Sequence, residues 1–263
     1  MISMHMSFRA FSLRRNVEVN VLIPQGADAN TGSLAKGETF KTLYLLHGYG
    51  GNCDDWLLNT RISLYAEQHN MAVIMPSCDD SFYLNQDEIH AGYERFVGKE
   101  LVEMTRTLFP LSRKREDTLI GGLSMGGYGA MHTGLAFPET FGSIIALSSA
   151  LIQNTVITMP EDFSNRFADY CYYRTVFGEP SKLAESDRNP EVLARRLKQE
   201  NAAIPNIYMA CGTEDFLIRE NRAFHQLLND LDIAHEYAEG PGVHDFDFWD
   251  AYIQKALDWY ESR

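Results

Sequence analysis

A glycine-rich turn around Ser124 constrains the fold of this chain more than any other feature. Gly122, Ser124 and Gly126 form the pattern G-x-S-x-G, which follows a short apolar run at residues 118–120 and precedes a stretch of helical length. The pattern is typical of a sharp strand-to-helix turn that lifts a serine hydroxyl above a parallel sheet. The alternative is a glycine-rich turn with an idle serine, because so short a pattern also arises by chance. The strand-turn-helix context favours the first interpretation.

The composition is that of a globular protein with a sizeable core. The chain has 263 residues, of which 45% are hydrophobic and 22% are charged. Its 36 acidic residues outnumber its 23 basic ones, so the formal net charge is −13. Nucleic acids and anionic membrane surfaces both attract clustered Lys and Arg, so this charge disfavours both as partners.

The sequence contains no apolar run near the roughly 18 residues of a membrane span, and residues 1–11 lack the apolar core of a secretory signal. Four cysteines, Cys53, Cys78, Cys171 and Cys211, have no paired spacing typical of metal sites. Without a signal sequence, free thiols in a reducing compartment are favoured over disulfides. We therefore expect a cytoplasmic protein.

Five short, continuously apolar runs are typical of buried parallel strands, whose two faces are both covered by helices. They lie at residues 43–46, 72–75, 119–120, 144–147 and 207–210. Segments with helical periodicity fill the gaps between them, at residues 93–108, 224–231 and 249–260. This alternation predicts βαβ units and a mostly parallel sheet.

Near the N-terminus, residues 17–23 alternate between apolar and polar side chains, and residues 7–13 form a less regular run before them. With Arg15 and Asn16 between the two runs, the pattern predicts an antiparallel hairpin at one edge of the sheet. No repeat or linker indicates a second domain. We expect one α/β domain over residues 1–263, with a twisted sheet of about eight strands and helices on both faces.

Residues 151–201 depart from this rhythm, because they contain several aromatic side chains and no convincing strand. One interpretation is an insertion whose aromatic rings pack into the main core. The other is a small cap over Ser124 that shapes an apolar substrate pocket, with Phe163, Phe167 and Tyr170 in contact with the substrate. The second interpretation favours an uncharged acyl or aryl group of modest size.

A serine hydroxyl becomes a good nucleophile only when a histidine accepts its proton. His225, His235 and His244 lie downstream of Ser124, beyond its own helix. His225 falls in an amphipathic helical stretch and His235 in a short strand-like run. His244 lies in the loop that joins this strand to the last helix, where an imidazole can reach the edge of the sheet. We therefore predict that His244 is the base, with a structural loop histidine as the alternative.

The histidine in turn needs a carboxylate to orient it. Asp215 follows the predicted strand at residues 207–210 and a short turn, which places it at the carboxyl end of a parallel strand. Sites in such sheets gather at that end. Asp215 is therefore the predicted acid, and Glu214 and Asp187 are the alternatives.

Asp245 and Asp247 lie close to His244 and could suggest a metal site. This trio is too short and lacks a second ligand cluster, so metal catalysis is disfavoured. We expect no metal and no organic cofactor.

Two backbone N–H groups near the serine would have to stabilise the negative oxygen of an acyl-transfer intermediate. Met125 supplies one from the turn itself. The other is expected in the glycine-rich loop after residues 43–46, with Tyr49 as first choice and Gly50 as second. His47 begins this loop, and we predict that it holds the loop in place.

Taken together, these motifs resemble the esterase D-like group of α/β-hydrolases. The chain is most similar to the branch that contains tributyrin esterases (EstA-type), feruloyl and acetyl-xylan esterases and S-formylglutathione hydrolases. The resemblance spans residues 8–259, and the segments that carry it are residues 46–51, 55–56, 81–83, 122–130, 211–215 and 244–250.

The resemblance implies the α/β-hydrolase fold and a serine carboxylesterase with Ser124, Asp215 and His244 as its triad. It also implies a small-molecule ester substrate, with Trp56 among the binding residues, and it implies that homo-oligomers are common. Esters with short acyl or aryl groups are the expected substrates. The alternatives are an S-formylglutathione hydrolase-type thioesterase, a feruloyl or acetyl-xylan esterase, an acyltransferase, and a non-catalytic binding protein on the same fold.

Overall fold

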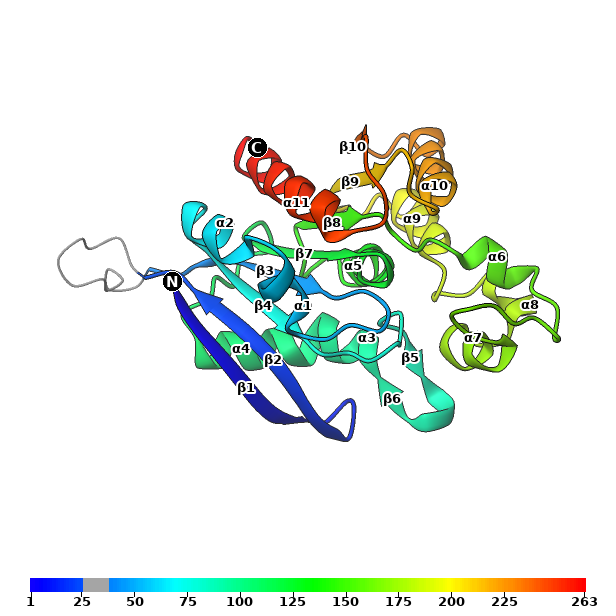
Figure 1. Ribbon diagram of the computed structural model, residues 1–263, viewed down its shortest axis with the longest axis horizontal. Helices are drawn as coiled ribbons and strands as arrows, with labels where there is room; N and C mark the ends of the chain where they lie inside the picture. The colour runs from blue at the N-terminus through cyan, green and yellow to red at the C-terminus, as the bar shows by residue number, and fades with distance from the viewer. Residues whose placement is uncertain (26–37) are drawn as a thin grey trace.

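The protein is built around one eight-stranded sheet, described here from a computed structural model covering residues 1–25 and 38–263 (Figure 1). The strand order is β1-β2-β4-β3-β7-β8-β9-β10. The first two pairs, β1–β2 and β2–β4, are antiparallel, and the remaining pairs are parallel. The strands are β1 (Ile2–Ala10), β2 (Arg15–Ile23), β3 (Lys41–Leu46), β4 (Met71–Pro76), β7 (Thr118–Leu123), β8 (Ser143–Leu147), β9 (Asn206–Gly212) and β10 (His235–Gly240).

The five apolar runs fall within β3, β4, β7, β8 and β9, as the sequence predicts. Alternate side chains of these strands enter two separate cores. In β3, Leu43 and Leu45 belong to the cluster on one face of the sheet, whereas Tyr44 and Leu46 belong to the cluster on the other. All four side chains are 0% exposed. A strand buried on both faces therefore shows no alternation in its sequence.

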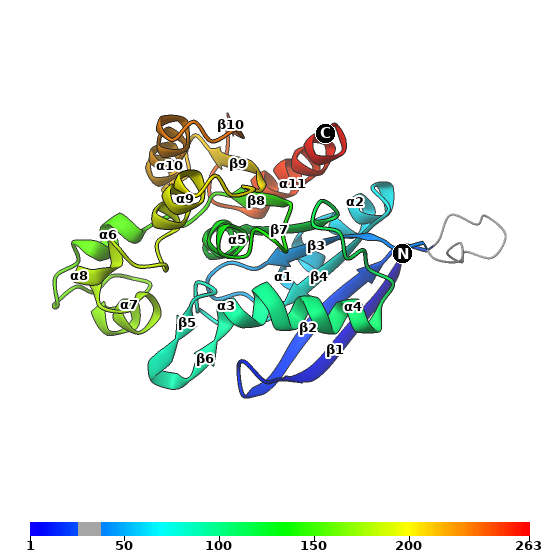
Figure 2. The ribbon, with the colours of Figure 1, turned by 180° about the vertical axis from the view of Figure 1, so that it is seen from behind.

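Helices cover both faces of the sheet, as Figures 1 and 2 show from opposite sides. One face carries α1 (Asp55–Asn59), α2 (Ile62–Gln68) and α11 (Phe246–Glu261). The other carries α4 (Leu101–Leu108), α5 (Met125–Ala136), α9 (Pro190–Gln199) and α10 (Ile218–Asp230). A short α3 (Tyr93–Arg95) and a π-helical segment η2 (Phe96–Glu100) precede α4.

The N-terminal hairpin lies at the sheet edge as predicted, but its turn lies elsewhere. The predicted turn at Arg15 and Asn16 is wrong, since both residues belong to β2 and the turn spans residues 11–14. The carboxylate of Glu100 accepts hydrogen bonds from the N–H groups of Phe11 (2.6 Å) and Ser12 (2.7 Å). This tertiary contact, which local sequence does not reveal, holds the turn in its observed position.

Beside this hairpin lies a two-stranded ribbon of β5 (Asn85–Gln86) and β6 (Ala91–Gly92), with the 3-10 helix η1 (Asp87–Ile89) between them. The N–H of Gly92 donates to the carbonyl of Ser12 at 2.9 Å, which fastens the ribbon to the hairpin turn.

Residues 151–201 form no strand, as predicted. They contain α6 (Gln153–Ile157), α7 (Tyr170–Phe177), α8 (Pro180–Leu183) and α9. The start of α9 agrees with its sequence, because Asn189 caps it by accepting a hydrogen bond from the N–H of Glu191 at 2.9 Å. Phe177 and Tyr173 are buried in the main core, at 1% and 6% exposure. None of the helices in the described parts of the chain is long and apolar enough to cross a membrane.

Candidate active site

Ser124 lies at the tip of the turn between β7 and α5. Its backbone has φ 53° and ψ −118°, a conformation that costs free energy for any residue other than glycine. The turn is held by a hydrogen bond from the N–H of Ser124 to the carbonyl of Leu147 at 2.9 Å. Gly126 lies against the end of β3, where a β-carbon would stand 2.5 Å from the carbonyl oxygen of Leu46. The G-x-S-x-G pattern therefore reflects close packing of helix and strand at this turn.

The structure brings Ser124, His244 and Asp215 together from three separate segments. The Oγ of Ser124 lies 2.9 Å from Nε2 of His244, and Nδ1 of His244 lies 2.8 Å from Oδ2 of Asp215. Asp215 follows β9, and His244 lies in the loop between β10 and α11. With Asp215 ionised, the proton on Nδ1 is donated to the carboxylate, and Nε2 is free to accept from the serine hydroxyl.

Asp215 is only 2% exposed. Burial alone raises the pKa of its carboxyl group, but hydrogen bonds from His244 and from the N–H of Leu217 (2.8 Å) outweigh burial and lower the pKa. The group therefore stays ionised in the range where an imidazole titrates.

The neighbouring Glu214 holds the loop that carries His244. Its Oε2 accepts a hydrogen bond from the N–H of Gly242 at 2.8 Å, and its own N–H donates to the carbonyl of Gly242 at 3.1 Å. These contacts, together with the Thr213 hydroxyl, lower the pKa of Glu214. The other alternative acid, Asp187, forms an ion pair with Arg196 at 2.9 Å instead.

The loop after β3 lies beside the serine, and the N–H groups of its residues Tyr49 and Gly50 differ in their hydrogen bonding. The N–H of Gly50 donates to the carboxylate of Asp80 at 2.6 Å. The N–H groups of Tyr49 and Met125 have no hydrogen-bond partner among the described residues. Of the two choices in this loop, Tyr49 is therefore the one whose N–H can serve a ligand.

His47 fastens this loop to the next segment. Its Nδ1 lies 2.7 Å from the carbonyl of Gly48, and its Nε2 accepts a hydrogen bond from the N–H of Cys78 at 2.9 Å. Burial lowers the pKa of His47, so the ring stays neutral and can accept at one nitrogen. This arrangement agrees with the structural role predicted for His47.

Ser124 and His244 open into a cavity of about 570 Å³, which we call the serine pocket. Eight aromatic side chains line it, namely Tyr49, Phe82, Phe163, Phe167, Tyr173, Phe216, Phe246 and Trp249. Phe163 and Phe167 line the pocket, and their contact with the substrate stays a prediction. The insertion both packs into the core and walls the pocket, so each of the two interpretations of residues 151–201 holds for some of its residues.

Two predicted substrate contacts are contradicted by the structure. Trp56 is 1% exposed, does not line the serine pocket, and donates its indole N–H to the carbonyl of Leu46 at 2.9 Å. Tyr170 also lies outside the pocket and packs its ring against the core, whereas Tyr173, about one helical turn later, reaches the pocket. The aromatic spacing in the sequence did not specify which side of α7 would face the serine.

Several pocket residues were missed by the sequence analysis although position could have suggested them. Phe216 directly follows Asp215, and its ring lies 4.5 Å from that of His244. Phe246 and Trp249 follow His244 within five residues, and the Trp249 ring lies 4.9 Å from the imidazole. Aromatic residues next to the predicted base and acid were the available signal.

Two tyrosine hydroxyls attach the insertion to the loop after β3 and to the segment after β4, which contains Asp80. Tyr49 donates to the carbonyl of Phe167 at 3.0 Å, and Tyr172 donates to the carbonyl of Asp80 at 2.7 Å. The ring of Phe167 also stacks on Phe216, with centroids 6.3 Å apart. The roof of the pocket and the loop beside the serine are therefore one connected structure.

Among the described residues, one group could hold a metal ion: His5, Cys53 and Asp54, whose ligand atoms lie within 4.8 Å of one another. None of them lines the serine pocket. The expectation that hydrolysis needs no metal or cofactor stays a prediction.

Comparison with known proteins agrees with this geometry. Residues 11–260 match the family described as "Putative esterase". An acetyl esterase from Caldicellulosiruptor saccharolyticus is 45% identical over 260 residues, which cover 98% of this chain and 98% of that protein.

Two solved structures share the fold over nearly their whole length. FphF, a fluorophosphonate-binding serine hydrolase from Staphylococcus aureus solved with substrate bound, has a TM-score of 0.86 and 28% identity, with 98% of each chain covered. The S-formylglutathione hydrolase FrmB from Staphylococcus aureus has a TM-score of 0.84 and 27% identity, again with 98% of each chain covered. The predicted resemblance and the predicted fold class are confirmed, and this chain belongs to the esterase family of α/β-hydrolases and is a carboxylic-ester hydrolase.

Proposed function

We propose that the protein is a serine esterase in which Ser124 is the nucleophile, His244 the general base and Asp215 the group that orients His244. The observation that carries this proposal is the pair of hydrogen bonds through His244, at 2.9 Å to Ser124 and 2.8 Å to Asp215. The order serine, aspartate, histidine along the chain is that of the α/β-hydrolases.

In the first step, Ser124 Oγ attacks the ester carbonyl carbon while His244 Nε2 takes the hydroxyl proton. The tetrahedral intermediate collapses as the imidazolium protonates the leaving alcohol, which leaves the acyl group on Ser124. In the second step, His244 deprotonates a water molecule that attacks the acyl-enzyme, and the acid and free serine are released. Asp215 fixes the imidazole tautomer and stabilises the imidazolium without taking its proton.

The N–H groups of Tyr49 and Met125 are the proposed donors to the oxyanion of both intermediates. The support is that neither has a partner among the described residues, while the N–H of Gly50 is engaged by Asp80. Gly50, the second choice from the sequence, is therefore set aside. The Asp80 contact is proposed to hold the loop so that the N–H of Tyr49 faces the intermediate.

Esters with a short acyl group are the proposed substrates. The serine pocket is lined mainly by aromatic and aliphatic side chains, which suit an uncharged acyl or aryl group. A relative that is 45% identical is an acetyl esterase. Acetyl and other short-acyl esters are therefore the first substrates to test.

A thioester such as S-formylglutathione is the second candidate, because one cation lines the serine pocket. The guanidinium of Arg166 lies 4.6 Å from the centre of the Phe167 ring and has no carboxylate partner among the described residues. It could pair with a carboxylate of a glutathione thioester, and FrmB is a structural relative that hydrolyses this substrate class by its name.

Labelling with a fluorophosphonate probe tests the nucleophile. We expect the wild-type chain to be labelled and Ser124→Ala to lose both the label and at least about 10⁴-fold of kcat/KM. Ser149→Ala is the matched control, because Ser149 is buried nearby and its hydroxyl has no hydrogen-bond partner in the part of the chain that the structure describes. Labelling that survives Ser124→Ala would refute the proposed nucleophile.

A substrate panel tests specificity. It contains p-nitrophenyl esters from acetate to palmitate, methyl ferulate and S-formylglutathione. We expect the highest kcat/KM on acetate or another short ester, and a peak on palmitate would contradict this expectation. Arg166→Gln separates the candidates, since it should impair hydrolysis of S-formylglutathione and leave p-nitrophenyl acetate unaffected if the thioester is the natural substrate.

Three further predictions concern the domain organisation, the oligomeric state and the location of the protein. The chain is proposed to act as one domain with residues 151–201 as its insertion, as a homo-oligomer, and in the cytoplasm. The four cysteines are free, which agrees with a reducing compartment. Light scattering of the purified protein measures the oligomeric state.

A further inference from the structure

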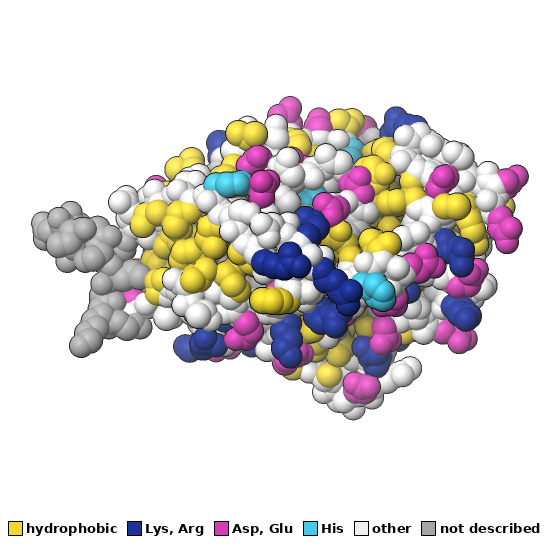
Figure 3. All heavy atoms as spheres, turned by 90° about the horizontal axis from the view of Figure 1, so that it is seen from below, with side chains coloured by type: hydrophobic (Ala, Val, Ile, Leu, Met, Phe, Trp, Pro, Cys, Tyr) yellow, Lys and Arg dark blue, Asp and Glu magenta, His cyan; other side chains and the backbone are white. Residues whose placement is uncertain are grey.

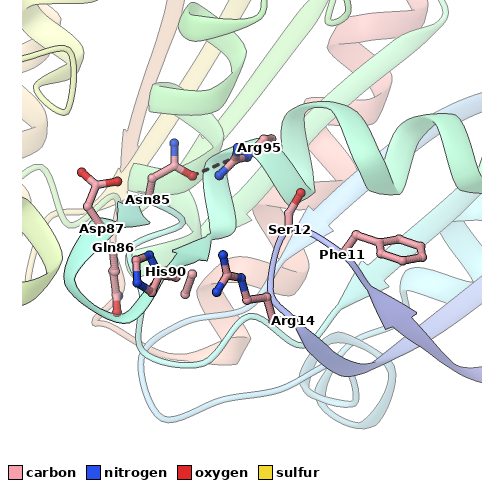
Figure 4. A pocket seen from close by; sticks show the side chains of 9 residues that line it. Phe11, Ser12, Arg14, Asn85, Gln86, Asp87, His90 and Arg95 are labelled. Carbon is pink, nitrogen blue, oxygen red and sulfur yellow. Dashed lines mark hydrogen bonds between the residues drawn. The ribbon is translucent and has the colours of Figure 1, made fainter.

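A second cavity lies between the turn of the N-terminal hairpin and the β5–β6 ribbon. Its volume is about 540 Å³, and it shares no lining residue with the serine pocket. We call it the hairpin pocket. Figure 4 shows Ser12 and Arg14 on the hairpin turn opposite Asn85, Gln86, Asp87, His90 and Arg95 on the ribbon, η1 and α3, with the ring of Phe11 turned away from the two arginines.

The pocket is locally cationic although the chain as a whole is acidic. Neither Arg14 nor Arg95 has an ion pair or a side-chain hydrogen bond among the described residues, and both line the pocket. Figure 3 shows Arg and Lys side chains gathered beside a histidine on the face that contains the hairpin. Two unpaired guanidinium groups in one cavity are unusual in a chain with a net charge of −13.

None of the nearby carboxylates forms an ion pair with Arg14 or Arg95 among the described residues. Asp87, which also lines the pocket, pairs with Arg188 at 2.9 Å, and Asp79 pairs with Arg15. Glu100 accepts the N–H groups of Phe11 and Ser12. The donor groups of both guanidiniums therefore remain open to a ligand.

The side chain of Gln86 lines the same pocket beside the two arginines. The residue is 6% exposed, and its amide has no hydrogen-bond partner among the described residues. Its polar atoms still reach solvent, so the amide N–H groups can donate to a ligand that enters the pocket.

The position of Arg95 is also fixed by its neighbour. A β-carbon on Gly92 would stand 2.7 Å from one terminal nitrogen of Arg95 and 3.0 Å from its Nε. Glycine at this position of β6 thus leaves the room in which the guanidinium lies. Its backbone φ of −96° is accessible to alanine, so a substitution would act through the arginine and not through the backbone.

We propose that the hairpin pocket binds a small organic anion, whose carboxylate or phosphate group is held by Arg14 and Arg95 and by the amide of Gln86. Guanidinium groups match the geometry of both oxyanions. Phe11 also lines the pocket and is 81% exposed, so its ring is free to turn toward the rest of a bound ligand. The site is separate from the serine pocket, so binding and ester hydrolysis are independent measurements.

Isothermal titration calorimetry of the full-length chain at low ionic strength tests this proposal. The probes are phenyl phosphate, benzoate and inorganic phosphate, with sodium chloride as the reference anion. We expect phenyl phosphate to bind more tightly than inorganic phosphate, because only the former can contact Phe11. Comparison of phenyl phosphate with benzoate identifies the preferred oxyanion.

The variants separate this pocket from any other binding site. R14Q/R95Q should weaken binding of the preferred probe at least about tenfold, and Gly92→Ala should weaken it by displacing Arg95. Arg195→Gln is the matched control, since Arg195 is exposed, has no ion pair among the described residues and lies outside both pockets. Hydrolysis of p-nitrophenyl acetate should be unchanged in all three variants.

Either of two results would overturn the proposal. One is binding no stronger than that of chloride by the wild-type chain. The other is equal affinity in the wild type and R14Q/R95Q, which would mean that the probe binds elsewhere, including in the serine pocket. Circular dichroism of each variant excludes misfolding as the cause of a loss.

Discussion

The serine pocket and the hairpin pocket have nearly the same volume, about 570 and 540 Å³, but their polar groups are arranged differently. In the serine pocket, the groups proposed for catalysis bind one another: Asp215 is held by His244 and Leu217, and His244 faces Ser124, while Arg166 lies at the wall, unpaired in the described part of the chain. In the hairpin pocket, the guanidinium groups of Arg14 and Arg95 have no ion pair or hydrogen bond among the described residues.

The volume of a cavity therefore says little about the kind of ligand that its polar groups can bind. A set of groups that satisfy one another is pre-organised to react with a neutral substrate, since little reorganisation is needed. Groups left without partners are instead suited to a charged ligand that supplies the missing contacts. The two pockets can therefore be separated by variants that disturb one and leave the other intact.

Replacing Asp215 should lower the hydrolysis rate most and leave the hairpin pocket intact. Asp215→Asn should lower kcat about 10⁴-fold, because an amide in place of the carboxylate favours the wrong imidazole tautomer. Initial rates with p-nitrophenyl acetate measure it. Binding of phenyl phosphate should be unchanged.

Glu214→Gln is the control for this variant, because Glu214 is the adjacent carboxylate and holds the loop of His244 without touching the imidazole. We expect it to retain activity within about tenfold of the wild type. If Asp215→Asn kept more than a tenth of the activity, Asp215 would not be the orienting acid.

The next prediction concerns the free energy of unfolding of the whole protein, which affects both pockets. His132 on α5 is 0% exposed, and burial lowers its pKa to about 4, whereas a histidine in an unfolded chain titrates near ~6.5. Between these values the unfolded chain binds a proton that the folded chain does not. Stability therefore falls as pH drops below ~6.5 and levels off near 4, with a loss of about 2 kcal/mol between pH 7 and pH 5.

Urea unfolding at pH 7 and pH 5 measures this loss. His132→Gln should remove this part of the pH dependence, whatever its effect on absolute stability. His69→Gln, at a histidine that lies 3.4 Å from Asp258, should retain it. Identical pH dependence in the wild type and His132→Gln would contradict the assignment.

A smaller effect is expected at Asp80, which engages the N–H of Gly50. Asp80→Ala should lower kcat about tenfold with little change in KM, because the loop that carries Tyr49, the proposed oxyanion donor, loses one anchor. Asp80→Asn keeps an acceptor oxygen and should restore most of the rate. A change in KM alone would indicate that Asp80 shapes the substrate pocket instead.

The smallest effect concerns the aromatic wall of the serine pocket. Phe216→Ala should raise KM for phenyl acetate about threefold to tenfold, because one ring contact is lost. Tyr170→Ala should leave KM unchanged, since Tyr170 lies outside the pocket. Equal effects of the two substitutions would mean that the rise in KM reflects general destabilisation.

The arrangement of Ser124, Asp215 and His244 could be predicted because each follows a strand or lies in a loop at one edge of the sheet. Their order along the chain and the type of each residue are local facts of the sequence. The strands themselves were predictable because burial on both faces produces continuous apolar runs. These features depend on the backbone path more than on the details of packing.

The pocket walls could not be predicted in the same way. Tyr170 and Tyr173 are similar residues on one helix, and the rotation of α7 about its axis decides which of them faces the serine. Trp56 was assigned to the substrate by resemblance, but its indole fills the core beneath the loop. Arg14 and Arg95 lie far apart in the sequence, and only the contact between hairpin and ribbon brings them together.

The hydrogen bonds of Tyr49 and Tyr172 bear on how substrate preference can change in this protein. Tyr49 fastens the insertion to the loop of the proposed oxyanion donor, and Tyr172 fastens it to Asp80, which holds that loop through Gly50. Any exchange of residues 151–201 therefore also alters the support of the proposed donor. Chimaeras that borrow this insertion from a relative should therefore lose turnover on every ester until both tyrosine anchors are rebuilt. Exchanging this insertion therefore changes the substrate selectivity and the turnover rate of the protein together.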